Sequence, residues 1–595
     1  MLRIALSLII ICANVVAGNH IEVIYPKDGQ QIPAVDSTFI LGNTESGANL
    51  TINGTSVKIH KDGGFLAFLP VEVGEFRFDL VSDNLGDICP TSIELIIGSA
   101  ADTSAVFIDL SSVSPSGKTA LLPGEIFEFS FKASAEGRAW CSLAGDSIWT
   151  RMYPAGQSGD LASVFGDIPD SDSPNARILY WGELSVNSIR DSSRVYFLFE
   201  IDRFDSVGAV QWTEFTIDST GYYIVKLAET LWRTIMLTGR PRIIRIAPGK
   251  GYRLVNQPAG VRFLCTGEMP DYYRVRLSRN SSGYVRKSDA VMEPIGTNPP
   301  RGEVSFITVN DFADSVRISA AFGDKLPFEI NTEDDLMTVE IYGLNSDTDW
   351  IRFNGAQAFI KSLRWSQPQD DIYRLNIRID DRHFWGYRGY YDGDEFVLRL
   401  NKRPPGRRFF HSAVNGLKIA IDPGHSHDSG AIGPTGLKEK DANLWIAHEL
   451  RRLLISKGAN VLMTRLGHED LDLNSRVDKV SKWGADLLIS IHNNALPDGV
   501  NPFTHNGTSV YYYFEQARPL AQAIHRRLLA ATKLPDHGLY YGNLALTRVT
   551  DCPSVLVECA FMMIPEQEAK LKTDRFQRQC ARAIYEGMCD YLEAK

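Results

Sequence analysis

The sequence lacks several features that mark specialised classes of protein. Only eight cysteines occur in 595 residues and none forms a Cys-x-x-Cys pair, which excludes a disulfide scaffold. No basic cluster is interleaved with aromatic residues, and the formal net charge is −10, so nothing indicates a nucleic-acid partner. Internal repeats and long low-complexity tracts are also absent. The remaining composition, 44% apolar and 23% charged, is that of a folded, soluble multidomain protein.

Long hydrophobic runs are missing everywhere except at the start of the chain. There Arg3 precedes an apolar stretch, 4–16, and the small residue Ala17 follows it. This pattern predicts a secretory signal peptide over 1–18, and hence a secreted protein with no stable membrane insertion after cleavage. An uncleaved anchor is the alternative, although the run is shorter than the roughly 20 residues that span a bilayer. Cys12 lies in this segment, so an odd number of cysteines remains, and at least one is a free thiol or forms an intermolecular link.

The first two thirds of the chain predict all-β modules. Residues 19–98 carry short strands of about five residues between Gly, Asn and Asp turns, which is typical of a small sandwich. This segment resembles the immunoglobulin-like modules that precede secreted bacterial enzymes. Residues 99–245 contain further β-like runs and predict a β-rich domain of uncertain type.

Two more β modules are expected before the last domain. Residues 246–295 resemble a bacterial SH3-like barrel, either one that holds cell-wall material or a spacer without a ligand. Residues 296–403 alternate with a period of two and resemble the β-sandwich modules of some periplasmic amidases. Their aromatic cluster either packs in the core or stacks on sugar rings. The Pro-Gly and basic residues of 404–416 predict an exposed linker.

From residue 417 the pattern changes to alternating strands and amphipathic helices. Such alternation predicts an α/β domain over 417–595 with a largely parallel sheet. Strands are expected at 417–421, 460–464, 486–491, 508–514, 544–547 and 554–557. Helices are expected at 440–457, 472–483, 517–532 and 575–593.

Four polar residues of this last domain lie at strand ends or at a helix start. His425 follows the first apolar strand, Glu439 precedes a helix, and His492 and Glu558 end two further apolar strands. Taken singly, His425 is also compatible with a solvated loop and Glu439 with a first-turn acid. Together they are expected to converge outside the carboxyl ends of one sheet. Two imidazoles and a carboxylate suit a catalytic zinc, but the wide spacing does not establish a metal site by itself.

A set of sequence motifs indicates the kind of site, which the spacing of the four residues alone does not. The chain reads Ile-Asp-Pro-Gly-His at 421–425, Glu-Lys-Asp at 439–441, Ser-Ile-His-Asn-Asn at 490–494 and Pro-Ser-Val-Leu-Val-Glu at 553–558. These pieces, in this order, make 417–595 resemble the zinc-dependent N-acetylmuramoyl-L-alanine amidases of the amidase 3 family. The expected architecture is therefore a multidomain protein with N-terminal all-β modules followed by an α/β zinc amidase domain.

The resemblance implies both a ligand set and a reaction. It places Zn²⁺ between His425, Glu439 and His492, and it makes Glu558 the catalytic acid–base. The implied function is hydrolysis of the bond between N-acetylmuramic acid and the L-alanine of the stem peptide. Peptidoglycan is the implied partner, in the periplasm or at the cell wall of a bacterium, and the sequence identifies no protein activator. A non-catalytic cell-wall-binding scaffold and another zinc hydrolase, a peptidase or deacetylase, remain as alternatives.

Two details of this domain lead to further expectations. Ser426-His427 stand where the family usually has two glycines, which makes His427 a candidate substrate contact or a loop residue. Asn494 is a second candidate substrate contact. Some members insert a blocking helix after the strand that corresponds to 508–514. Here 513–515 lead directly into a helix, so we expect an open site.

Overall fold

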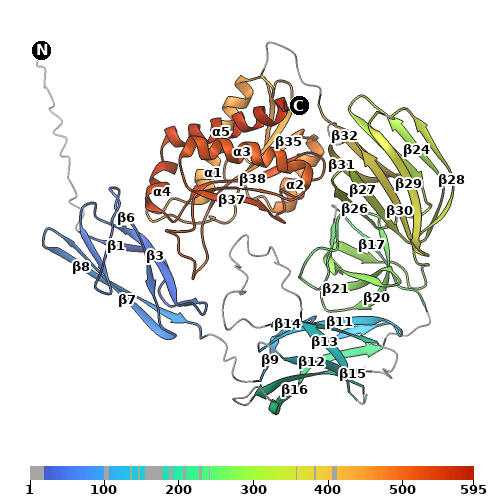
Figure 1. Ribbon diagram of the computed structural model, residues 1–595, viewed down its shortest axis with the longest axis horizontal. Helices are drawn as coiled ribbons and strands as arrows, with labels where there is room; N and C mark the ends of the chain where they lie inside the picture. The colour runs from blue at the N-terminus through green and yellow to red at the C-terminus, as the bar shows by residue number, and fades with distance from the viewer. Residues whose placement is uncertain are drawn as a thin grey trace, which may run out of the picture.

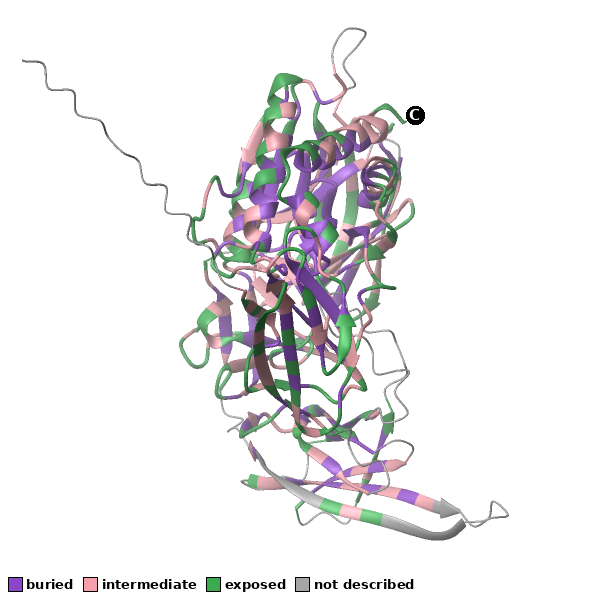
Figure 2. Ribbon diagram, turned by 90° about the vertical axis from the view of Figure 1, so that its left-hand side faces the viewer, coloured by how far each residue is buried: buried purple, intermediate pink, exposed green. Residues whose placement is uncertain are grey.

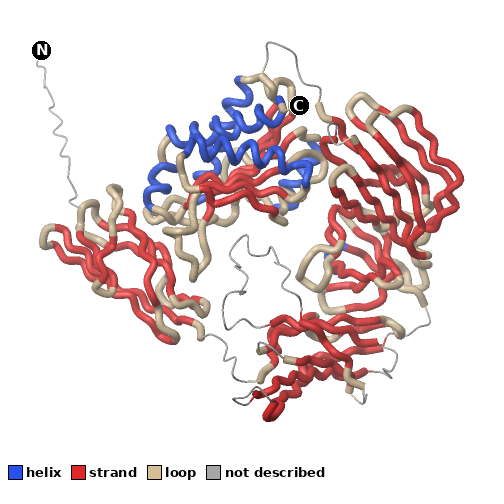
Figure 3. The backbone as a smooth tube through the Cα atoms, in the orientation of Figure 1, coloured by secondary structure: helices blue, strands red, loops and turns tan. Residues whose placement is uncertain are grey.

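The computed structural model describes residues 19–99, 106–134, 137–144, 148–154, 178–185, 192–204, 210–226, 231–239, 242–356, 358–380, 384–404 and 412–594. The expected signal peptide, 1–18, lies outside the described residues, as does most of the expected linker. β-sheet domains surround one helix-rich domain (Figure 1, Figure 3). Among the described residues, no helix has both the length and the apolar character needed to cross a membrane.

The N-terminal domain is a two-sheet sandwich. A three-stranded sheet, β1-β3-β6, and a five-stranded sheet, β2-β8-β7-β4-β5, enclose one apolar core. Phe65 and Phe78 are fully buried there, and Phe78 alternates with the exposed polar residues Arg77 and Asp79 along β7. The strands are β1 Ile21–Tyr25, β2 Gln30–Ile32, β3 Ser37–Thr44, β4 Asn49–Ile52, β5 Thr55–Val57, β6 Gly64–Pro70, β7 Gly74–Asn84 and β8 Asp87–Ile97.

The second and third β units share hydrogen-bonded strands. β10 joins β16 on one side and β20 on the other, so the two units form one continuous ladder. The second unit comprises β9 Ile108–Ser114, β10 Thr119–Leu121, β11 Ile126–Ala133, β12 Arg138–Leu143, β13 Thr150–Pro154, β14 Ile178–Ser185, β15 Ser192–Phe204 and β16 Val210–Lys226.

The third unit begins earlier than residue 246. β17 pairs with β20 and β23, and β18 pairs with β19, which places strands from before residue 246 around the same core. The expected boundary at 245/246 therefore passes through this unit. Its elements are β17 Thr234–Leu237, β18 Arg242–Ile244, β19 Leu254–Gln257, β20 Arg262–Glu268, β21 Tyr272–Ser278, β22 Ser281–Arg286, η4 Lys287–Asp289 and β23 Ala290–Met292.

The fourth unit is a second sandwich that packs against the helix-rich domain. Its sheets run β28-β24-β25-β32-β31 and β26-β27-β30-β29 over a shared core. The contact with the last domain includes a backbone hydrogen bond, in which the Tyr387 amide donates to the Thr550 carbonyl at 2.7 Å, and a side-chain bond from Asn401 to the Asp551 carbonyl at 2.7 Å. The strands are β24 Gly302–Asp311, β25 Ser315–Ala321, β26 Phe328–Glu333, β27 Leu336–Tyr342, β28 Leu344–Asn354, β29 Ile360–Gln369, β30 Ile372–Ile379, β31 Phe384–Asp392 and β32 Glu395–Lys402.

The C-terminal domain is built on a six-stranded sheet of order β34-β33-β35-β38-β36-β37 with helices on its faces (Figure 3). β34, β33, β35 and β38 are parallel, whereas β36 is antiparallel to β38. The strands are β33 Lys418–Pro423, β34 Asn460–Met463, β35 Leu487–Asn494, β36 Thr508–Tyr512, β37 Asp536–Tyr541 and β38 Ser554–Phe561. The helices are α1 Glu439–Ser456, α2 Leu473–Trp483, η6 Glu515–Ala517, α3 Arg518–Thr532, α4 Pro565–Leu571 and α5 Asp574–Glu593.

The central strands of this sheet are buried on both faces, as the purple ribbon of Figure 2 shows. All eight residues of β38 are buried, which explains its near-continuous apolar sequence. One expected strand is absent: 544–547 forms a turn, and β37 takes the edge position instead. The reason is local, because the Thr547 hydroxyl donates to the carbonyls of Gly542 and Leu544 at 2.7 and 3.0 Å and so stabilises the turn.

Candidate metal centre

The candidate site lies where the three central parallel strands end. β33 leads into the turn that carries His425, and β35 carries His492 close to its own end. β38 lies beside β35 in a register that sets His492 opposite Glu558. Glu439 is the first residue of α1, which packs on β33 and β35. Four residues from four separate elements therefore meet at one edge of the sheet.

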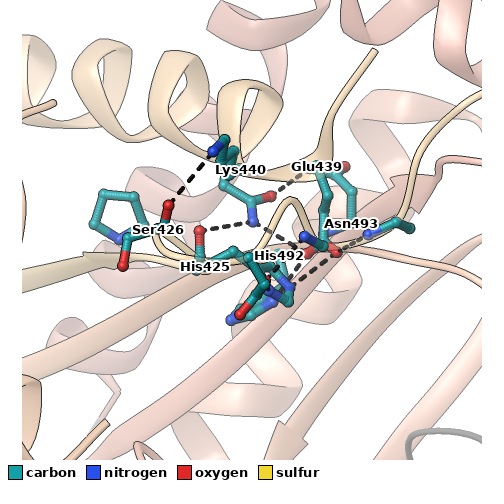
Figure 4. Close-up of polar contacts among 12 residues, drawn as sticks. His425, Ser426, Glu439, Lys440, His492 and Asn493 are labelled. Atoms are coloured by element: carbon teal, nitrogen blue, oxygen red, sulfur yellow. Dashed lines mark hydrogen bonds and ion pairs between the residues drawn. The ribbon is translucent and has the colours of Figure 1, made fainter. Parts of the chain in front are cut away.

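Three of these side chains form a compact group of potential ligands (Figure 4). The Nε2 atom of His425 lies 2.9 Å from one oxygen of Glu439, and the Nδ1 atom of His492 lies 3.0 Å from the other. The ligand atoms of all three lie within 4.8 Å of one another. Glu439 thus bridges both imidazoles, and two nitrogens and a carboxylate are a donor set that suits zinc.

The group is oriented by a surrounding hydrogen-bond network. Asp428 contacts the Nδ1 atom of His425 and so directs its Nε2 atom toward Glu439. The Asn443 amide, one helical turn after Glu439, donates to that carboxylate at 3.1 Å. The Ala431 amide donates to the other carboxylate oxygen at 3.0 Å. Such outer contacts fix the tautomer and rotamer of metal ligands.

The electrostatics of the group reflect close pairing of opposite charges. Burial by itself would raise the pKa of Glu439, but hydrogen bonds from His425 and His492 outweigh it and hold that pKa well below the ordinary value. Burial by itself would lower the pKa of His425, but pairing with Glu439 and Asp428 raises it. A divalent cation would take the place of these protons.

The backbone of the turn after β33 approaches the imidazoles closely. A methyl group added at Gly424 would lie 2.2 Å from the His492 ring, and one at Gly430 would lie 2.4 Å from the Glu439 carboxylate. His425 itself has φ of 59°, a left-handed conformation that non-glycine residues seldom adopt. The glycines of this turn are therefore needed for space beside the ligands.

Two buried arginines donate hydrogen bonds to backbone carbonyls of the same turn. Arg465 donates to the carbonyls of Pro423 and Gly424 at 3.0 and 2.8 Å. Arg476 donates to the His425 carbonyl at 2.7 Å and to the Asp422 carboxylate at 2.9 Å. Sequence reasoning did not single out Arg476 or Asn443. The only available signal was a charged or amide residue on the inner face of an otherwise amphipathic helix.

Glu558 is set apart from the ligand group and is fully buried. Its Oε2 atom has no hydrogen-bond partner among the described residues. Burial and the nearby charge of Glu439 raise its pKa well above that of an ordinary carboxyl. Ser509, directly opposite on β36, also has a buried side-chain oxygen without a partner in this part of the structure. Unpaired buried polar atoms are rare, and here they leave hydrogen-bonding capacity for a ligand.

The two remaining candidate residues occupy different environments. Asn494 is buried two residues after His492 in β35, and its side-chain oxygen accepts from the Ala495 amide at 2.8 Å. His427 is exposed and lies 3.3 Å from Asp470, outside the ligand group. The segment after β36 passes directly into η6 and α3. No additional helix is inserted in the described stretch between β36 and η6, where some family members are expected to carry one that covers the site.

The ligand group at the edge of the sheet, with a separate buried carboxylate beside it, is a site that could hold a metal ion. A family model described as N-acetylmuramoyl-L-alanine amidase matches residues 419–590. The chain belongs to this family through its C-terminal domain, which confirms the resemblance inferred from the motifs.

The relatives match the same third of the chain. The N-acetylmuramoyl-L-alanine amidase LytC of Bacillus subtilis (strain 168) is 37% identical over 183 residues, which cover 30% of this chain and 36% of LytC. The uncharacterised protein YqiI of the same strain is 34% identical over 185 residues, which cover 30% of this chain and 87% of YqiI. The solved catalytic domain of CwlV, an amidase from Bacillus (Paenibacillus) polymyxa var. colistinus, shows 32% identity. It has a TM-score of 0.28, with 30% of this chain and 99% of that domain covered.

Proposed function

We propose that the C-terminal domain hydrolyses the amide bond between N-acetylmuramic acid and the L-alanine of the stem peptide in peptidoglycan, with zinc as cofactor. The observation that carries the proposal is the ligand group His425, Glu439 and His492 with Glu558 buried beside it. Bound in this group, zinc would supply an acidified water and polarise the substrate carbonyl. The N-terminal signal motif and the cell-wall relatives support a site of action at the bacterial cell wall.

Glu558 is proposed to move the proton. Burial and the nearby charge of Glu439 raise the pKa of Glu558, which makes it a stronger proton acceptor than an ordinary carboxylate. It accepts the proton of the attacking water and delivers it to the leaving amine of L-alanine. Without that delivery the amine would leave as an unstable anion. Ser509, opposite Glu558 on β36, is proposed to orient this carboxyl, and Asn494, two residues after His492, is proposed to contact the substrate.

Replacing the proton carrier tests the assignment. Glu558→Gln keeps the shape of the side chain but cannot accept a proton, so we expect about a 10²–10⁴-fold loss of rate. Bound zinc, measured by elemental mass spectrometry, should stay at the wild-type level because Glu558 is not a ligand. Glu515→Gln is the matched control, since Glu515 is exposed and pairs only loosely with Arg518 at 3.6 Å. A near-native rate for Glu558→Gln would show that another group carries the proton.

Product analysis separates the proposed reaction from its alternatives. Mass spectrometry of digested sacculi should show stem peptides with a free N-terminal L-alanine. Released acetate would indicate a deacetylase, cleavage within the stem a peptidase, and no product a binding scaffold. A chelator should abolish the reaction and added zinc should restore it.

A further inference from the structure

The N-terminal sandwich docks directly on the rim of the candidate site. Phe39, Leu41 and Leu66 from its three-stranded sheet form one buried apolar cluster with Phe561 and Met563 of the last domain. Phe561 is the last residue of β38, three positions after Glu558. The two domains lie side by side in Figure 1, although their sequences are separated by three other β units.

Polar contacts extend this interface to the segments that carry the site residues. The hydroxyls of Tyr25 and Thr38 donate to the two carboxylate oxygens of Asp498 at 2.6 and 2.5 Å, in the segment that follows His492. The Asn43 amide donates to the Pro434 carbonyl at 3.1 Å, in the segment that precedes Glu439. The sandwich therefore touches the segments next to His492, Glu439 and Glu558.

A groove of about 520 Å³ runs along this interface. One wall comes from β5 and β6, and the other comes from Phe503, Asn506 and the start of α4. Asn506 accepts from Gln567 at 2.9 Å, and Gln567 in turn accepts from the Phe561 amide at 2.8 Å. The 503–506 wall leads directly into β36, where Ser509 lies opposite Glu558. None of the candidate ligands lines the groove, which lies beside the candidate site and is linked to it in sequence through the 503–506 segment and β36.

The chemistry of the groove fits an uncharged polymer. The side chain of Phe503 is 57% exposed, so part of this aromatic residue is open to solvent at the groove. The charged groups of the lining are already paired, Lys58 with Glu566 at 2.7 Å and His60 with Asp62 at 2.5 Å. The exposed hydroxyl residues Thr55 and Ser56 complete the wall. Aromatic faces, small polar groups and no free charge suit sugar rings better than an anionic peptide.

We propose that this groove is a subsite for the glycan strand, built jointly by the N-terminal sandwich and the C-terminal domain. The inference rests on the proposed function, because it extends the substrate of that same site beyond the bond that is cut. Sugar rings stack on Phe503, and the neighbouring sugars lie between β5 and the 503–506 segment.

Substrates of two lengths test the subsite in the full chain. Phe503→Ala should lower kcat/KM on uncross-linked polymeric peptidoglycan by about five- to tenfold, the usual cost of removing one aromatic anchor. The change should appear in KM, and turnover of a single disaccharide-peptide should stay within twofold. Ser56→Trp, which fills the opposite wall, should give the same pattern. Phe306→Ala, an exposed aromatic of the second sandwich, is the matched control and should change neither substrate.

Direct binding distinguishes failure of the subsite from failure of the proposed reaction. A soluble, uncharged N-acetylglucosamine oligomer should bind the wild-type chain with little dependence on salt, and Phe503→Ala should weaken it about fivefold or more. That result supports the subsite, whether or not the chain cleaves peptidoglycan. If the wild type cleaves neither peptidoglycan substrate, only the proposed reaction is overturned. Unchanged oligomer binding, or equal losses on both substrates, would overturn the subsite.

Discussion

At the scale of single residues, the buried ion pair between Asp422 and Arg476, next to the candidate ligands, is a position where mutation should lower the stability of the fold. Asp422 accepts from Thr464 at 2.6 Å, from Ser490 at 2.8 Å and from the fully buried Arg476. Burial alone would raise the pKa of Asp422, but Arg476 and the two hydroxyls outweigh it and lower that pKa. The carboxylate therefore stabilises the folded state only while it is ionised.

Asp422→Asn should leave the Arg476 charge buried without a partner, at a cost of about 3–5 kcal/mol in unfolding free energy. The lowered pKa of Asp422 also gives the direction of the pH effect.

The stabilisation by Asp422 is complete above its unfolded pKa of about 3.9 and is lost as the pH falls below that value toward the folded pKa. Denaturant unfolding of wild type and variant at neutral pH and near pH 3 should show the difference shrinking in acid. Asp470→Asn, at an exposed position, is the control and should change stability by less than about 0.5 kcal/mol. A constant difference across this range would contradict the assignment.

At the scale of elements, the turn between β33 and α1 decides whether the ligands meet. Its shape depends on Gly424, Gly430 and the arginine contacts to its carbonyls. Because α1 starts immediately after this segment, Glu439 faces both imidazoles with the first turn of the helix. The start of α1 thus brings Glu439 to the two imidazoles and completes the group of candidate ligands.

Gly424→Ala should damage this turn without unfolding the domain. The added methyl would lie 2.2 Å from the His492 ring, so the imidazole must leave its position beside Glu439. We expect zinc affinity to fall by at least about tenfold, as for loss of an orienting contact, while circular dichroism stays unchanged. Gly467→Ala is the matched control, since its methyl would come no closer than 3.6 Å to Glu469. Wild-type zinc affinity in a competition assay would contradict this account of the turn.

At the scale of the whole molecule, the chain closes back on itself. The N-terminal sandwich contacts one side of the C-terminal domain, and the second sandwich contacts another through Tyr387 and Trp385 (Figure 1). The Trp385 indole donates to the Asp486 carbonyl at 2.6 Å. The C-terminal domain is therefore held between modules from both ends of the β region.

Asp498→Ala should loosen only the N-terminal contact. The substitution removes the acceptor of the Tyr25 and Thr38 hydroxyls and leaves the apolar cluster in place. Hydrogen exchange in 496–506 should rise, and solution scattering should report a larger radius of gyration, while turnover of a disaccharide-peptide stays within about twofold. Asp470→Ala serves as control, because Asp470 lies away from this interface and pairs with His427. Unchanged exchange and scattering would show that the apolar cluster alone fixes the domain.

The sequence by itself determined the elements whose signals are local. The apolar strands that lead to His425, His492 and Glu558, and the amphipathic periods of the helices, indicated where the candidate site lies, whereas its proposed chemistry came from the motif resemblance. The strands expected at 417–421, 460–464, 486–491 and 554–557 overlap β33, β34, β35 and β38 for this reason. The pattern failed at 544–547, where side-chain bonds to backbone outweigh strand propensity.

Only the tertiary structure decided what depends on distant partners. The contacts of Arg476 with Asp422, and of Asn443 with Gly424 and Asn493, cannot be read from their own helices, because these partners lie on other elements. The membership of β17 and β18 in the third unit and the docking of the N-terminal sandwich beside Glu558 are of the same kind. Local periodicity sets which face of an element is apolar, but complementarity of shape and polar pairing selects the surface that covers it.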